Sequence, residues 1–396
     1  MRRLRFLLAL AVSAGMLTGC WDRREINDVA FVLGTSLDKE GDRLVASLQF
    51  PLPSTMGGAG SRGGGGGTGG DKPWYSNSVI GKSLGEIRYK QQRSVSRHLF
   101  LGHRRVFLFG EELARSGIER VLDEVVRNPI SRLDTYVLVT EGPAAEMLNA
   151  DVTVEKLPVE KIRELNNTFM NHPANFKYVI DVLNSEGIDL ALPYIRKHVR
   201  TGGVERDQIV PLLDSVAVFR EGRMVGILQG YHASSLLWMM DEARRPLVII
   251  PGPTGKGSIT VQMQRTSSSI RPVIRGRDIS FRITLDGYGY VMENTTNQDL
   301  SSHGRLEIAE RLLRGTLEEQ AKETLDLLQR EWHADPLGLG REIHRHAPRL
   351  WKEIRDGWKD IYRELDIAVE ARAHLENTGL LVSPAGVDED ESEEIK

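Results

Sequence analysis

The N-terminal segment constrains this chain more than any other feature, because it sets the environment in which the rest must fold. Arg2, Arg3 and Arg5 precede a mostly apolar run of 12 residues at positions 6–17. That run is shorter than the ~20 residues that a helix needs to span a bilayer, but it suits the apolar region of an export signal. We therefore predict a signal peptide over residues 1–19.

Leu17-Thr18-Gly19-Cys20 has the pattern at which bacterial lipoprotein signals are cleaved. Cys20 would then be the new N-terminus and carry a diacylglyceryl thioether, with an additional N-acyl chain left open. Two acyl chains hold a protein stably at a membrane, because each buried methylene contributes ~0.8 kcal/mol. Cys20 is the only cysteine, so the exported body must fold without disulfides. An ordinary signal peptide with an incidental cysteine is the alternative.

Composition excludes some partners. The chain has 396 residues, 40% of them hydrophobic and 27% charged, which is enough for two or three globular domains. Its net charge is −3, and removal of the arginine-rich signal makes the remainder more acidic. Without a basic field, nucleic-acid binding is not expected.

In the first half, strand-like and helix-like segments alternate, which predicts a mixed α/β unit. The expected strands are residues 26–37, 43–50, 74–80, 104–109, 135–140 and 189–199, with residues 38–42 as a turn. The expected helices are residues 83–96, one from 110 to 127, 143–148, and 157–183 with an interruption at Pro173. Between them, residues 57–70 hold ten glycines in 14 positions, which predicts a mobile loop rather than a phosphate-binding loop of defined geometry.

The second half is expected to begin after a polar linker at residues 200–208. A β-hairpin is predicted over residues 214–228, with Glu221-Gly222 as its turn. A helix at 230–242 and strands at 247–250, 258–265 and 277–285 follow. The long helix predicted at 306–332 carries an apolar stripe that indicates a domain core rather than an exposed binding face. A helix at 347–362 and a strand at 365–376 complete the fold.

These segments predict an α/β (mixed α+β), multidomain protein behind a signal peptide. The expected divisions are residues 20–200, of which 150–200 could form a separate middle unit, residues 209–384, and an acidic, disordered tail at 385–396.

The chain carries little that indicates catalysis. Residues 252–258 (Gly-Pro-Thr-Gly-Lys-Gly-Ser) have the glycine spacing of a nucleotide-binding loop, but Ser258 stands where the lysine belongs. His344 and His346 would point about 200° apart on a helix and could not share a metal. Asp134, Asp189 and Asp214 adjoin strands, but their separations are not set by the sequence. We therefore expect no catalytic residues, no metal site and no cofactor.

Four blocks of the chain form a distinctive combination. The first is Cys20-Trp21-Asp22-Arg23-Arg24-Glu25-Ile26-Asn27-Asp28, and the glycine tract is another. The third is Leu101-Gly102-His103-Arg104-Arg105-Val106, followed by Phe109-Gly110-Glu111-Glu112-Leu113-Ala114, and the last is Asp335-Pro336-Leu337-Gly338-Leu339-Gly340, followed by Pro348, Trp351 and Trp358. Together they resemble the Ger(x)C family of spore germination lipoproteins: the third block is similar to the family's central N-terminal block, and the last resembles its C-terminal signature.

This resemblance implies a non-enzymatic C subunit of a nutrient germinant receptor, lipid-anchored on the outer face of the spore inner membrane. In that family such a subunit works with integral membrane A and B subunits. Because no ligand motif is recognisable in this chain, we expect it to act in receptor assembly and germination signalling, with germinant binding mainly on the B subunit. Trp21, Arg23, Arg24 and Glu25 would then contact partner subunits or headgroups, or simply begin the first domain. Trp351 and Trp358 are expected to anchor the core, and Gly102-His103 to form a turn. A solute-binding lipoprotein of a transporter and an anchored cell-wall hydrolase are the alternatives.

Overall fold

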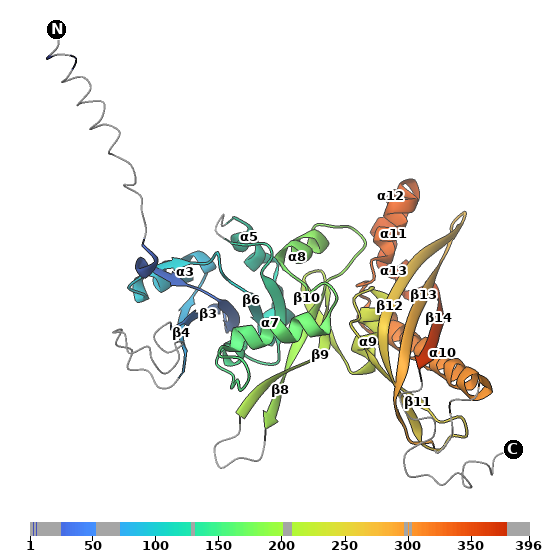
Figure 1. Ribbon diagram of the computed structural model, residues 1–396. Helices are drawn as coiled ribbons and strands as arrows, with labels where there is room; N and C mark the ends of the chain where they lie inside the picture. The colour runs from blue at the N-terminus through green and yellow to red at the C-terminus, as the bar shows by residue number, and fades with distance from the viewer. Residues whose placement is uncertain are drawn as a thin grey trace.

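The structure is elongated, with an eight-stranded sheet in its N-terminal half and a four-stranded sheet in its C-terminal half (Figure 1). This computed structural model describes residues 25–52, 72–127, 131–200, 208–296, 300 and 303–377, together with Arg3 and Arg5. The signal segment at 6–19, Cys20, the glycine tract and the acidic tail lie outside the described residues.

The first strand is shorter than the sequence predicts. After a 3-10 turn (Ile26–Asp28), β1 (Val29–Phe31) pairs in parallel with β5 (His98–Phe100) in a separate two-stranded sheet, and β2 begins only at Gly34. The chain crosses between sheets at Val32, whose N–H bonds to Phe100, and Leu33, whose N–H bonds to Gln49. The expectation of one strand over residues 26–37 is therefore wrong, because its two ends find different partners.

The eight-stranded sheet forms the centre of the N-terminal half. In spatial order its strands are β10 (Arg223–Gln229), β9 (Gln208–Arg220), β8 (Ala191–Arg200), β7 (Tyr136–Thr140), β6 (Val106–Gly110), β2 (Gly34–Glu40), β3 (Arg43–Pro51) and β4 (Trp74–Gly81). The four central strands β8, β7, β6 and β2 are parallel, and antiparallel strands flank them on both sides. Strand β2 runs on to Glu40, so the predicted turn at 38–42 is reduced to Gly41-Asp42.

Helices cover both faces of this sheet. Strand β6 is buried throughout, as expected of a central parallel strand. Phe107 and Phe109 face one core, and Val106 and Leu108 face the other, because strand side chains alternate. The first core contains residues of α3 (Leu84–Ser94), α4 (Glu111–Ser116), α5 (Glu119–Arg127) and α8 (Phe176–Leu183), and the second those of α6 (Ala144–Leu148) and α7 (Pro158–Phe169).

The single helix predicted over residues 110–127 is divided into α4 and α5. Gly117 separates them with a φ of +116°, and its N–H bonds to Leu113 at 3.0 Å. Such a conformation is open to glycine and strained for other residues, so the chain can turn here while both helices keep their apolar faces on the sheet. The spacing of the apolar residues does not reveal this bend.

The expected linker at 200–208 joins two neighbouring strands. Strand β8 pairs with β9 from Ala191 opposite Val218 to Arg200 opposite Gln208, and β9 turns through Glu221 and Gly222 into β10. Both turn residues have positive φ, which suits a two-residue hairpin and confirms that prediction. The chain beyond the expected linker therefore completes the N-terminal sheet before it enters the second half.

The four-stranded sheet has the order β11 (Leu247–Pro251), β12 (Ser258–Arg275), β13 (Asp278–Asn294) and β14 (Asp366–Asn377). Strands β12 and β13 are much longer than predicted. In β12 the polar run Ser267-Ser268-Ser269 hides the alternation, although pairing with β13 continues to the turn at Gly276, and in β13 Gly287 and Gly289 interrupt the apolar pattern beyond Leu285. Helices α9 (Tyr231–Met239) and α10 (His303–Asp326) contribute to the core beside this sheet. The predicted apolar stripe of α10 is buried there, as expected.

The C-terminal helical segment, residues 327–364, contacts both halves of the molecule. Helix α10 continues as a π-helix (Leu327–Trp332), and α11 (Leu339–His346), which was not predicted, follows. The helix expected at 347–362 is divided into α12 (Pro348–Ile354), a 3-10 turn (Arg355–Gly357) and α13 (Trp358–Glu364). Among the described residues, no helix is both long and apolar enough to cross a membrane.

Candidate functional site

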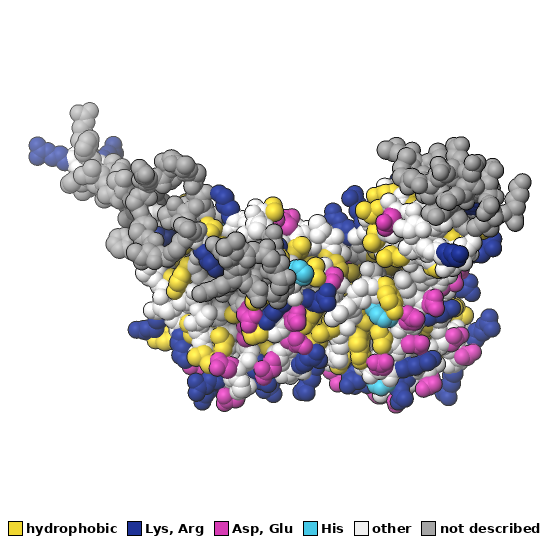
Figure 2. Space-filling view, turned by 90° about the horizontal axis from the view of Figure 1, so that it is seen from below, with side chains coloured by type: hydrophobic (Ala, Val, Ile, Leu, Met, Phe, Trp, Pro, Cys, Tyr) yellow, Lys and Arg dark blue, Asp and Glu magenta, His cyan; other side chains and the backbone are white. Residues whose placement is uncertain are grey.

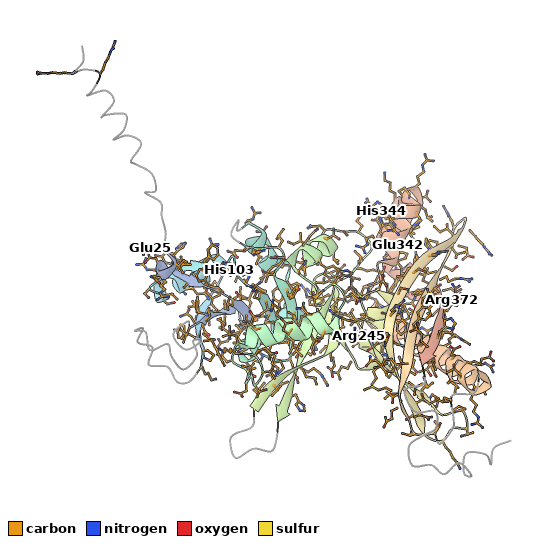
Figure 3. The ribbon with its side chains drawn as sticks, in the orientation of Figure 1. Glu25, His103, Arg245, Glu342, His344 and Arg372 are labelled. Atoms are coloured by element: carbon orange, nitrogen blue, oxygen red, sulfur yellow. The ribbon has the colours of Figure 1, made fainter. Side chains whose placement is uncertain are left out.

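Most residues of the predicted anchor and partner surface lie outside the described part of the chain. Cys20, Trp21, Arg23 and Arg24 fall there, so their roles remain predictions. Glu25 is exposed and lies at the same end of the molecule as His103 (Figure 3).

The block that contains Gly102 and His103 forms a turn between β5 and β6, as predicted. Arg104 N–H bonds to Leu101 at 3.1 Å, and the His103 ring packs against Phe31 and Phe100, with centroids 5.3 and 5.4 Å apart. The turn connects the two-stranded sheet to the eight-stranded sheet. Arg105 N–H bonds at 2.7 Å to Leu33, which lies where the chain passes from β1 to β2.

This turn buries one of two consecutive arginines. Arg105 is exposed, whereas Arg104 is only 6% exposed and packs its guanidinium against Phe107 and Phe176, 5.1 and 5.4 Å from the ring centroids. Burial lowers the pKa of Arg104 to about 10, so it remains a cation at neutral pH. Its Nη2 has a long contact of 3.5 Å with Ser131 Oγ, and its Nε has no hydrogen-bond partner.

Arg104 lines a cavity of about 540 Å³, which we call the Arg104 cleft. Apolar side chains from β3, α3, β5 and β6 form most of its wall, including Leu48, Ile87, Leu99 and Phe107. Thr35 also lines the cleft, and its buried hydroxyl has no hydrogen-bond partner. The cleft therefore combines an apolar wall with two buried, unpartnered polar groups.

A second cluster connects the two halves, and we call it the junction. It contains Glu186, Gly187 and Asp189 before β8, and Asp335, Gly340, Trp351 and Trp358 from the C-terminal helical segment. Asp189 Oδ2 accepts a bond of 2.9 Å from Asp335 N–H, and the Asp335 carbonyl accepts one of 2.8 Å from Asp189 N–H. The Asp335 carboxylate in turn accepts bonds from the N–H groups of Leu339 and Gly340, both at 3.0 Å. It thereby caps the first turn of α11.

Aromatic and charged groups extend the junction. Glu186 accepts bonds from Trp351 Nε1 at 2.7 Å and from Arg355 at 3.0 Å. Trp351 and Trp358 are buried and meet edge to face with centroids 5.5 Å apart, which confirms their expected place in the core. Sequence spacing alone placed them on one helix, whereas the structure places them on α12 and α13.

Two glycines allow the halves to approach closely. Gly187 has a φ of +72°, and a Cβ built on it would lie 2.5 Å from the carbonyl carbon of Gly340. A Cβ on Gly340 would lie 2.7 Å from Gly187 Cα and 2.8 Å from the Trp351 ring. Neither position can accept a side chain without displacement of the other half.

Burial shapes the electrostatics of the junction. It raises the pKa of Asp335 to about 7, against the lowering effect of the two N–H groups, and the nearby Asp189 carboxylate raises it further. Burial also raises the pKa of Asp189 and of Tyr362.

The other candidate motifs have structural roles. The segment at 252–258 is the turn between β11 and β12, where Gly252 N–H bonds to Gly257 at 3.0 Å. His344 stacks on Trp351, and His346 Nδ1 lies 2.9 Å from the Glu342 carbonyl oxygen. Figure 3 shows Glu342 and His344 on α11. Within the described residues, no three His, Cys, Asp or Glu side chains are arranged to hold a metal.

The face of the molecule shown in Figure 2 carries charges of both signs. On the face shown in Figure 2, Lys and Arg side chains of the coloured residues alternate with Asp and Glu over both halves. That face presents mixed charge instead of the basic stripe that nucleic-acid binding requires.

Sequence reasoning missed the two features that define these clusters. Asp189 was noted only as a residue beside a strand, and its contact with Asp335 spans 146 positions. Arg104 was part of a recognised block, but its burial was not expected. No local signal marks it, since Arg105 lies one residue closer to β6 and is exposed.

The fold and the sequence agree with one group of proteins. Residues 22–197 match the family described as "Spore germination protein N-terminal domain", and residues 214–379 match "Spore germination B3/ GerAC like, C-terminal". The two matched segments meet within the β8–β9 hairpin and not between the two sheets.

Individual proteins agree with this assignment. The chain is 32% identical to "Putative spore germination protein YfkR" of Bacillus subtilis (strain 168), over 92% of this chain and 94% of that protein. It is 25% identical to "Spore germination protein KC" of the same strain, over 97% of this chain and 98% of that protein. The solved structure titled "Crystal Structure of the GerBC protein" has the same fold, with a TM-score of 0.53, 19% identity, and coverage of 90% of this chain and 100% of that one. The chain belongs to the Ger(x)C family of spore germination proteins.

Proposed function

We propose that this protein is the lipid-anchored, non-enzymatic C subunit of a spore nutrient germinant receptor. The observation that carries the proposal is the match to spore germination proteins over both halves of the chain, including 32% identity over 92% of it. The subunit would sit on the outer face of the spore inner membrane and act in receptor assembly and germination signalling with integral membrane A and B subunits.

The proposed anchor would hold the first domain close to the membrane. Cys20 precedes β1 by nine residues, so the start of the sheet would lie within roughly 30 Å of the lipid-bearing residue. Such tethering raises the effective concentration of the body near embedded partners, and a weak contact by Trp21, Arg23, Arg24 or Glu25 then suffices.

The junction supports a signalling role. Hydrogen bonds that Glu186 and Asp189 accept from Trp351 and Asp335 connect the two halves directly, so a force on one half can reach the other. A solute-binding lipoprotein of a transporter would instead need two lobes that close over a ligand. The direct bonding between the halves favours the receptor subunit.

The anchor is tested by Cys20→Ala in the native strain. We expect loss of the protein from the spore membrane fraction and slower nutrient-triggered germination, with unchanged germination by a non-nutrient trigger. Retention in the membrane together with normal nutrient germination would contradict the anchor.

The partner contacts need a separate experiment. A variant with alanine at Trp21, Arg23, Arg24 and Glu25, but with Cys20 intact, should remain in the membrane and co-purify less A and B subunit. Wild-type recovery of both subunits would place the contacts elsewhere.

A further inference from the structure

The Arg104 cleft contains a buried cation that no carboxylate of the described residues pairs with directly. Glu124 also lines the cleft, but its Oε1 pairs with Arg88 at 3.2 Å across α3 and α5. Arg104 is left with two aromatic faces and one long contact to Ser131. A buried charge without a hydrogen-bonded partner is costly, so such an arrangement needs an explanation.

Thr35 is a second, independent indication that a hydrogen-bonding partner is missing from the cleft. Its Oγ1 is buried beside the cleft without a hydrogen-bond partner. The amides of the cleft are occupied, since Gln91 donates to Ala46 O at 3.1 Å and Gln92 accepts from Leu99 N–H at 3.0 Å. The donors without a partner are therefore Arg104 Nε and the Thr35 hydroxyl, and both groups can donate to a carboxylate.

We propose that the Arg104 cleft binds a small organic acid with one carboxylate and an apolar body. The carboxylate accepts hydrogen bonds from Arg104 Nε and the Thr35 hydroxyl, and the body packs on Leu48, Ile87, Leu99 and Phe107. The volume of about 540 Å³ is within the usual range for small-molecule sites. This ligand site goes beyond the proposed receptor role and can be tested without germination.

The charges around the cleft define the ligand more closely. Glu124 at the wall disfavours a second negative charge, which argues against phosphates and dicarboxylates. Arg104 is a single cation, and its fork matches one planar carboxylate. The apolar wall selects an aromatic or branched aliphatic body over a sugar. Phenylacetate has this chemistry, and phenylacetamide is its uncharged counterpart of the same shape.

The experiment is isothermal titration of the full-length chain in lipid nanodiscs, with empty nanodiscs as the blank. We expect saturable binding of phenylacetate, and at least tenfold weaker binding of phenylacetamide. Arg104→Met should weaken phenylacetate binding at least tenfold, whereas Arg105→Met, which changes the adjacent exposed arginine, should leave it unchanged. Thr35→Val preserves shape and should weaken binding severalfold.

A further variant guards against loss of folding in Arg104→Met. Gly85 lines the cleft in the first turn of α3, and a Cβ there meets no atom closer than 4.0 Å. Gly85→Phe should fill the cleft and abolish binding in a folded protein, while Gly85→Ala should bind like the wild type. The proposal is overturned by equal affinities for acid and amide, by unchanged affinity in Arg104→Met or Gly85→Phe, or by no binding up to about 10 mM.

Discussion

The junction and the Arg104 cleft both bury charge, but they do so in opposite ways. At the junction, Asp189 and Asp335 receive hydrogen bonds from backbone N–H groups, and glycines bring the backbones into contact. In the cleft, Arg104 Nε and Thr35 Oγ1 lack such partners, and both residues line a cavity. The junction is a finished structural contact, whereas the cleft has the properties of a binding site.

The difference shows how buried polar groups can be interpreted. Satisfied groups in dense packing fix one arrangement of the chain, and their removal leaves partners unpaired. An unsatisfied group next to a cavity adds little to stability and is free to bind something else. Each prediction below tests one side of this contrast.

The largest effect is expected from Gly187→Ala. The positive φ and the overlap with the Gly340 backbone should together lower the free energy of unfolding by about 3–5 kcal/mol. Urea unfolding followed by tryptophan fluorescence measures this, because Trp351 and Trp358 lie at the junction. Gly315→Ala is the matched control: it lies within α10 with no atom within 4 Å of its Cβ, and should stabilise by ~0.5–1 kcal/mol. A mild effect at Gly187 would mean that the halves move apart easily.

Asp335 should make stability depend on pH. Its folded-state pKa is raised from 3.8 to about 7. Between about pH 4 and pH 7 the folded protein therefore binds one proton more than the unfolded chain. The stabilisation is complete below about pH 4 and is lost as the pH rises through 7, with roughly 3 kcal/mol lost between pH 5 and 8. Asp335→Asn should reduce this difference in the free energy of unfolding between pH 5 and pH 8, as measured by urea unfolding at both pH values. Asp356 is an exposed carboxylate near the junction, and Asp356→Asn should retain the pH dependence of the wild type. An unchanged pH dependence in Asp335→Asn would mean that another group binds the proton.

Arg104→Met should alter stability little, in contrast to the junction variants. Loss of the contacts with Phe107 and Phe176 is offset by removal of a desolvated charge, so the free energy of unfolding should stay within about 1 kcal/mol of the wild type. Thermal and urea unfolding measure it, with Arg105→Met as the exposed control. A loss of more than about 3 kcal/mol would make Arg104 a structural residue like those of the junction.

The smallest effect is expected at the edge of the junction. Lys359 pairs with Glu221 between α13 and the β9–β10 turn, and both side chains are largely exposed. Lys359→Gln should change the free energy of unfolding by less than about 0.5 kcal/mol, because water and salt screen such pairs. A larger change in low salt that persists in high salt would show that this contact belongs to the buried network.

Local pattern predicted much of the fold. Strands β3, β4 and β7, helices α3, α7 and α8, and the hairpin turn at Glu221-Gly222 follow from apolar spacing and turn residues, which act over a few positions. The predicted strands end too early, in β12 because a run of serines follows residue 265 and in β13 because glycines follow residue 285. The break at Gly117 was missed because the apolar spacing continues across it.

The sequence by itself determined the membership in the family, the mixed α/β character, the burial of Trp351 and Trp358, and the expectation of a lipid anchor at Cys20. These depend on motifs and periodicities within short segments. Only the tertiary structure decided that β9 and β10 complete the first sheet, that Asp189 meets Asp335, and that Arg104 is buried while Arg105 is exposed. Such outcomes depend on which distant surfaces exclude water from a residue, and neighbouring residues of the same type carry no local mark of that difference.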